Sequence, residues 1–165
     1  AALDPTKATA EAKKDFHDVA KRYDAAKAKG ALSKGQCEEF SKAFEKVYRD
    51  HGKQMTVAYF NSGAVWDECG DSQKAEDIYL AVTKAVPKYD LSYNNLGVIQ
   101  ASRGQLDLAR ESFEMALRNH PNYDVALENL GDVLLRQARV AYETSLRINP
   151  ASKTVPRKLQ ALPTP

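Results

Sequence analysis

The stretch PKYDLSYNNLGVIQASRGQLDLARESFEMALRNHP, residues 87–121, decides how the rest of the chain folds. Its apolar residues recur at helical spacing on both sides of Gly104, which indicates two amphipathic helices joined by a turn. Gly97 in the first helix and Ala109 in the second are small, whereas Phe113 in the second helix is large. Two helices cross closely where small residues lie between bulky ones. The stretch therefore predicts a helical hairpin with a proline at each end.

The same unit recurs upstream and, in part, downstream. A shift of 34 residues places like on like at ten positions: Pro87 with Pro121, Ala75 with Ala109, Gly70 with Gly104, Gly63 with Gly97, Asn61 with Asn95, Tyr59 with Tyr93, Tyr89 with Tyr123, Asn95 with Asn129, Leu96 with Leu130 and Gly97 with Gly131. A helical hairpin of this period, with this order of small and aromatic residues, resembles the tetratricopeptide repeat (TPR) family. The resemblance covers about residues 56–150.

The resemblance implies an all-α fold, a right-handed α-solenoid of TPR helical hairpins, built as a single domain over residues 1–165. Three repeats are expected at 56–89, 90–123 and 124–150, followed by a C-terminal tail at 151–165.

Residues 6–51 are expected to form a degenerate N-terminal hairpin that caps the repeats. Asp4 is a candidate cap for its first helix. Its second helix, GQCEEFSKAFEKVYRDHG at residues 35–52, aligns with residues 104–121, and Phe44 takes the place of Phe113. The alternative is an unrelated helical hairpin docked on the repeats by the same packing.

The third repeat is shorter than the second. Gly97 and Pro121 are 24 residues apart, whereas the corresponding Gly131 and Pro150 are only 19 apart. The five absent positions are those of the turn and of the start of the second helix, residues 104–108 in the second repeat.

Two interpretations of this shortening remain open. In the first, the turn is truly absent and residues 127–148 run as one long helix, which offers its apolar face to another chain and favours exchange of helices between two copies. In the second, a mobile loop has been left out of the sequence between Gln137 and Ala138. We favour the second, because Ala138, Tyr142 and Ser145 otherwise keep the register of the repeat.

The two cysteines are placed to form a disulfide. Cys37 begins the second expected helix and Cys69 ends the third, at nearly equal distances from the turn near residues 51–54. In an antiparallel pair, equal distances place two residues opposite each other, so the sequence predicts a Cys37–Cys69 bridge. Such a bridge implies an oxidising compartment. The alternative is a pair of buried free thiols, as in cytosolic repeat proteins.

Composition and motifs exclude several classes of function. The 24 Lys and Arg residues are interleaved with 22 Asp and Glu residues, so no basic surface for nucleic acid is indicated. No apolar run reaches the roughly 18 residues of a membrane span. No cluster has metal-ligand spacing, and no catalytic triad, P-loop or dinucleotide motif is present. We therefore expect a protein that is not an enzyme and that uses neither metal nor cofactor.

In the TPR family the first helix of each repeat lines a concave groove that binds extended peptides or partner helices. Carried over to this sequence, the resemblance implies nine peptide-binding candidates: Phe60, Asn61, Ala64, Asn94, Asn95, Val98, Glu128, Asn129 and Asp132. The three asparagines that recur once per repeat, Asn61, Asn95 and Asn129, are expected to form a ladder. An amide both donates and accepts hydrogen bonds, which suits a peptide backbone. Alternatively, these asparagines only tie neighbouring helices together.

One kind of TPR domain is not expected here. Domains that clamp the C-terminal carboxylate of chaperones carry Lys and Arg in these first helices, whereas this chain has Phe60, Ala64, Asn94 and Glu128. A receptor for chaperone tails is therefore disfavoured.

The expected function is a protein–protein interaction scaffold whose partner is a peptide or a helix of another protein. A structural module that forms a homodimer through helix exchange is the alternative. The expected bridge and a chain that begins AALDP without Met favour a periplasmic or outer-membrane-anchored protein of a bacterium. The expected protein is similar to the periplasmic TPR lipoproteins that serve pilus assembly or gliding motility. The alternative location is the cytoplasm.

Overall fold

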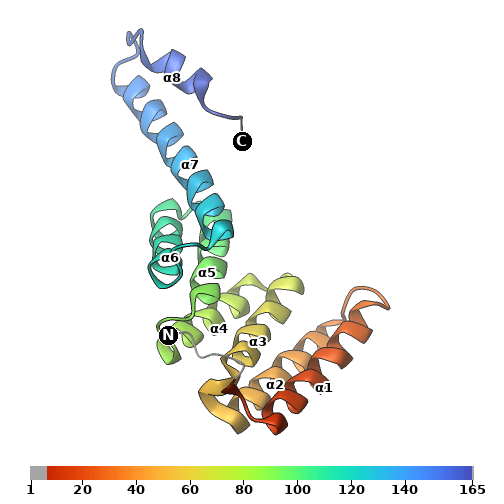
Figure 1. Cartoon of the computed structure of the whole chain (residues 1–165). Coiled ribbons are helices and arrows are strands. Elements are labelled where there is room, and N and C mark those ends of the chain that lie inside the picture. Colours follow the sequence, from red (N-terminus) through yellow and green to blue (C-terminus); the bar gives the residue numbers. More distant parts are fainter. Residues whose placement is uncertain (1–6, 165) are drawn as a thin grey trace. The chain divides into compact units, whose positions relative to one another are not determined.

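The computed structural model describes residues 7–164, which form helices joined by short turns, with no strand among them (Figure 1). The predicted all-α fold of repeated helical hairpins is confirmed. The helices in chain order are α1 (Ala10–Lys27), α2 (Lys34–His51), α3 (Thr56–Glu68), α4 (Ser72–Ala85), α5 (Asp90–Ser102), α6 (Leu106–Asn119), α7 (Asp124–Ile148) and α8 (Val155–Ala161), with a short 3-10 helix, η2 (Gly52–Met55), between α2 and α3.

The chain divides into two compact units, which we call unit 1 (residues up to Leu96) and unit 2 (residues from Gly97). The boundary falls inside α5, so the second repeat contributes to both units. The candidate site lies entirely in unit 2.

In unit 1, α2 packs against both α1 and α3, and α3 packs against α4. Aromatic rings fill these contacts: the Tyr23 ring lies 5.4 Å from Phe40 and 5.9 Å from Phe44. Phe60 lies 5.4 Å from Tyr79, which is fully buried. These rings supply much of the apolar area that holds the hairpins together.

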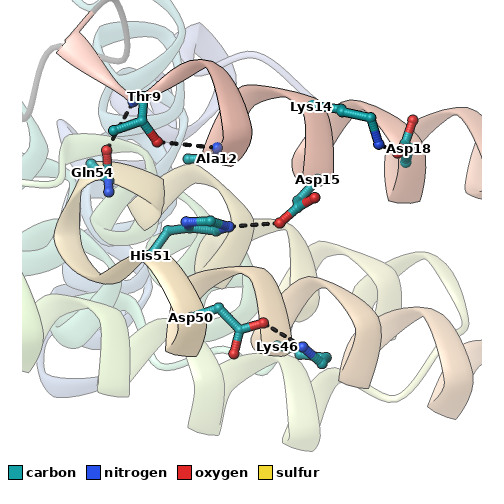
Figure 2. A network of polar contacts seen from close by, with 9 residues as sticks. All are labelled: Thr9, Ala12, Lys14, Asp15, Asp18, Lys46, Asp50, His51 and Gln54. Atoms are coloured by element: carbon teal, nitrogen blue, oxygen red, sulfur yellow. Dashed lines mark hydrogen bonds and ion pairs between the residues drawn. The ribbon is translucent and has the colours of Figure 1, made fainter.

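Polar contacts join the beginning of α1 to the end of α2 (Figure 2). The Thr9 side chain caps α1 by accepting from the amide of Ala12, and the amide of Thr9 donates to Oε1 of Gln54 over 3.0 Å. His51 Nε2 lies 2.7 Å from Oδ2 of Asp15. Helix α1 therefore begins at Ala10 and not near residue 6; the expected Asp4 cap lies outside the described residues.

A disulfide joins Cys37 and Cys69, with an S–S distance of 2.10 Å and a Cα–Cα distance of 6.4 Å. Cys37 lies in the first turn of α2, and Cys69 follows the last residue of α3. The antiparallel pairing of these two helices brings the cysteines together, as their equal distances from the turn predicted.

Helices α3 and α5 end at equivalent glycines in the left-handed conformation. The φ angle is 81° at Gly70 and 75° at Gly104. A residue with a Cβ atom is disfavoured in this region, whereas glycine adopts it freely. Each glycine lets the chain reverse into the second helix of its repeat.

The third repeat has no such reversal, and here the interpretation favoured from the sequence is wrong. Helix α7 continues without a break through Gln137 and Ala138, over 25 residues. Because the turn residues are absent, nothing interrupts the backbone hydrogen bonds, and the two halves of the repeat join end to end. Figure 1 shows the second half of α7 extending beyond α6 and meeting α8.

Candidate functional site

A groove of about 440 Å³ lies in unit 2, bounded by α5, α6, α7 and the segment that follows α8. Its walls are mostly apolar and carry two arginines and one aspartate. The lining residues are Val98, Ala101, Phe113, Asn129, Asp132, Val133, Leu135, Arg136, Arg139, Pro163 and Thr164.

Packing of α7 against α6 fixes one wall of this groove. The centre of the packing is a cluster of Ala109, Phe113 and Val133, with Leu130 beside it. Val133 is buried, whereas Asp132 and Leu135, which point about 100° and about 160° away from it around the helix, lie at the open surface. The sequence period of α7 therefore decides which side chains face the groove.

Two arginines of α7 bind backbone carbonyl groups at the groove. Arg136 Nη1 donates to the carbonyl oxygen of Ala101 over 2.8 Å, which joins α7 to α5. Arg139 Nη2 donates to the carbonyl oxygen of Pro163 over 2.8 Å. A guanidinium group has five N–H donors in a plane, so each arginine can hold a carbonyl and still meet a second acceptor.

The segment held by Arg139 has an extended backbone. Leu162, which follows the last residue of α8, has φ −76° and ψ 140°. Pro163 and Thr164 then line the groove. The groove therefore already accepts an extended stretch of polypeptide through one backbone carbonyl.

The structure brings three of the nine candidates together in this groove: Val98, Asn129 and Asp132. Glu128 is exposed on α7 but is not one of the lining residues, and Asn61 and Ala64 are half-buried in α3.

Three other candidates take part in the packing of unit 1. Phe60 stacks on Tyr79 and lies 5.7 Å from Tyr89. Asn94 is only 5% exposed. Asn95 Nδ2 donates to the Tyr79 hydroxyl over 3.1 Å, so its amide ties neighbouring helices together.

The hydroxyl that accepts from Asn95 has a shifted pKa. Burial, only partly offset by the hydrogen bond from Asn95, raises the pKa of Tyr79 to about 12. The charged form is disfavoured because it would lose its hydration inside the packed helices. The phenol therefore remains a neutral hydrogen-bonding group far above physiological pH.

Sequence reasoning missed Leu135, the two arginines and Pro163. Leu135 and Arg136 lie one helical turn after the expected groove residues of α7. Continuing the helical period by one turn would have identified them. No comparable signal exists for Pro163, because its position depends on how the segment after α8 folds back.

Within residues 7–164, no group of three or more His, Cys, Asp or Glu side chains could hold a metal ion. None of the described helices is long and apolar enough to cross a membrane.

Residues 68–124 and 96–143 match the family model described as Tetratricopeptide repeat. These two matches cover the second helix of the first repeat, the whole second repeat and most of α7. This part of the chain consists of tetratricopeptide repeats. TPR hairpins generally mediate protein–protein interactions and form a non-catalytic family. No curated protein matches the chain at a significant level. The matched residues do not include the N-terminal hairpin, whose membership of the repeat stack stays a prediction.

Proposed function

We propose that this TPR protein is an interaction scaffold that binds an extended segment of a partner protein in the groove of unit 2. The observation that carries the proposal is the contact of Arg139 with the Pro163 carbonyl. Because the groove holds one extended segment in this way, a partner segment of similar conformation can be held by the same arginine.

The composition of the groove indicates what such a segment carries. Val98 and Leu135 are exposed apolar residues on its walls, so an apolar side chain of the partner would be removed from water there. Arg136 and Arg139 suit backbone carbonyls or an acidic side chain of the partner. A partner helix is less well suited, because its carbonyls are already hydrogen-bonded within the helix.

A library of displayed random peptides tests the proposal. Peptides enriched on the wild-type protein are synthesised with a fluorophore, and their dissociation constants are measured by anisotropy. Leu135→Ser and Arg139→Ala should each weaken binding about tenfold or more, in line with a hot-spot contact. Val140→Ser is the matched control, because Val140 is an exposed apolar residue of α7 outside the groove. Equal binding to all variants, or no enrichment at all, would reject the groove.

We propose further that the protein works in an oxidising compartment, as a periplasmic or outer-membrane-anchored component of a motility or pilus machine in a bacterium. The disulfide supports this location, because such bridges persist where thiols are not kept reduced. Fractionation of the producing cells, followed by labelling of free thiols in denatured protein, tests it. We expect the protein outside the cytoplasm with neither thiol labelled; two labelled thiols in a cytosolic fraction would contradict the location.

Dimerisation through helix exchange, the alternative function, uses a different face of α7 from the groove. The two activities therefore do not exclude each other.

A further inference from the structure

The two complete repeats share one contact between their helices. In each, a glycine of the first helix lies directly against an aromatic ring of the second. A Cβ atom on Gly63 would lie 2.8 Å from Tyr79, and one on Gly97 would lie 2.5 Å from Phe113. Both rings are buried, so the contact of glycine with ring is what closes each hairpin.

The third repeat has both residues but not the contact. Gly131 occupies the position of Gly97, and Tyr142 that of Phe113 once the five absent residues are allowed for. A Cβ atom on Gly131 would meet nothing within 4 Å. Gly131 and Tyr142 lie on one continuous helix, about 16 Å apart along its axis, so they cannot meet within one chain.

The face of α7 around Gly131 is apolar and open. Leu134 is 45% exposed, whereas Gln100 and Trp66, at the same position in the other repeats, are each 8% exposed. Leu127, two turns before Leu134, is 50% exposed. The leucines are therefore uncovered where the second helix of the repeat would lie.

Tyr142 has only half of the surroundings that its counterpart has. Tyr79 contacts Gly63 of its own repeat and also Asn95 of the helix that follows. For Tyr142 the contact with the following helix is present, because Lys158 Nζ of α8 lies 5.6 Å from the centre of its ring. The missing contact is the one with a glycine.

We propose that a second copy of this chain covers the open face, with its α7 antiparallel to the first and the partner's Tyr142 packed on Gly131. This antiparallel pairing is symmetric, so both copies make the same contacts. When Gly131 of one copy lies opposite Tyr142 of the other, antiparallel alignment also places Tyr142 of the first copy opposite Gly131 of the second. The two-fold axis then passes between Arg136 and Gln137, and both copies complete their third repeat.

Large and small residues alternate across this pairing. We call the residues that share the face of Gly131 the exchange strip: Leu127, Gly131, Leu134, Ala138, Ala141, Tyr142 and Ser145. In the proposed register Leu134 lies beside Ala138 and Ala141 of the partner, and Leu127 lies beside the partner's Ser145. Between Leu127 and Ser145 the strip contains no charged residue. Asp124 shares the same face at the beginning of α7, and in this register it lies opposite the partner's uncharged Asn149, so two identical copies can meet without repulsion.

The size of the strip is sufficient for a specific contact. A helix of 25 residues extends about 37 Å and is roughly 10 Å wide, which gives a flat footprint on the order of 400 Å² on each copy. Interdigitating side chains bury more than the flat footprint. The total therefore comes near the roughly 1,000 Å² expected of a specific interface, at the low end of the range for stable complexes.

Reinsertion of the missing turn is the decisive experiment. A variant that carries a copy of residues Gly104–Leu108 between Gln137 and Ala138 can fold the second half of α7 back onto its own first half. Sedimentation equilibrium from micromolar to near-millimolar concentration should show the mass of two chains for the wild type and of one chain for the insertion variant. Circular dichroism confirms that both remain helical.

Two matched substitutions identify the face that is used. Leu134→Ser, on the exchange strip, should weaken the dimer at least tenfold, whereas Val140→Ser should leave it unchanged. Val140 is 53% exposed on the same helix but points away from the strip. Gly131→Leu should abolish the dimer and leave the single chain folded, because its side chain enters open space there.

A wild-type chain that stays monomeric over the whole concentration range would overturn the proposal. A dimer that persists in the insertion variant, or that Leu134→Ser and Val140→Ser weaken equally, would also overturn it. None of these outcomes affects peptide binding in the groove, so the two proposals fail separately.

Discussion

Gly97 and Gly131 occupy the same position in successive repeats, yet a methyl group added to each has opposite consequences. At Gly97 it would lie 2.5 Å from the buried ring of Phe113, so the ring or the helix would have to shift. At Gly131 it would enter open space. Packing therefore requires a glycine at position 97, whereas within a single chain it allows a larger residue at position 131.

We expect Gly97→Ala to lower the free energy of unfolding by about 2 kcal/mol, since overpacking outweighs the gain in helix propensity. Gly131→Ala, measured in dilute protein, should raise it by roughly 0.5–1 kcal/mol through helix propensity alone. Urea denaturation followed by circular dichroism measures both. Equal effects at the two glycines would contradict the packing described for Phe113.

Titration of the Tyr79 phenol makes the free energy of unfolding depend on pH in the alkaline range. Its pKa is about 12 in the folded chain and 10.0 when unperturbed, so between these values the unfolded chain loses the proton and the folded chain keeps it. Stability is therefore fully present below pH 10 and falls as pH rises toward 12, by roughly 2–3 kcal/mol in total.

Tyr79→Phe should remove this part of the alkaline loss while lowering stability near neutral pH through loss of the hydrogen bond with Asn95. Denaturation curves of both proteins from pH 8 to pH 12 measure the difference. Since burial also raises the pKa of Tyr23 and of Tyr59, only the difference between the two proteins reports on Tyr79. Parallel curves would show that Tyr79 titrates normally.

The role of a single residue could be predicted from the sequence where the same packing contact recurs in each repeat, as at Gly63 and Gly97. The orientation of residues on the surface was less predictable. Phe60 and Asn94 resemble groove residues by position, but the rings of Tyr79 and Tyr89 draw Phe60 into the packing of unit 1. Which of two adjacent polar residues points inward depends on such neighbours, and one sequence does not reveal them.

At the scale of elements, the disulfide joins the beginning of α2 to the end of α3 and so closes the hairpin opposite its turn. The two cysteines are 32 residues apart, and closing a loop of that size in the unfolded chain is worth about 3–4 kcal/mol in the chain-entropy picture. The combined substitution Cys37→Ala and Cys69→Ala should lower the free energy of unfolding by that amount. Urea denaturation measures it, and wild-type protein treated with reductant should behave like the variant. A loss below about 1 kcal/mol would show that the bridge contributes little.

Element boundaries followed from local chemistry, whereas the length of α7 did not. Gly70 and Gly104 end helices because they can take positive φ, and both were visible in the sequence. The register of Ala138, Tyr142 and Ser145 favoured a missing loop between Gln137 and Ala138, but register only shows which face a residue occupies. With no glycine or proline near these residues, helix propagation continues through them.

At the scale of the whole molecule, α7 carries two surfaces that share no residue. The groove uses Asp132, Leu135 and Arg139, and the exchange strip uses Gly131, Leu134 and Tyr142. Leu135 lies at the edge between the two surfaces, whereas the other groove residues of α7 point away from the strip, so we expect both surfaces to be occupied at once.

The Leu134→Ser variant should therefore bind a groove peptide with the wild-type dissociation constant while forming the dimer at least tenfold more weakly, because Leu134 does not line the groove. Anisotropy titration and sedimentation of the same samples test this. Loss of peptide binding together with the dimer would show that the groove is complete only between two copies.

The bridge between Cys37 and Cys69 also has a mechanical consequence. If the chain were pulled from its two ends, the 32-residue segment between the sulfur atoms would be bypassed and could not be drawn out. That segment would otherwise lengthen the chain by about 110 Å. Under tension α1 and α4 could therefore be extended, whereas most of α2 and α3 would be extended only after a reductant has opened the bridge.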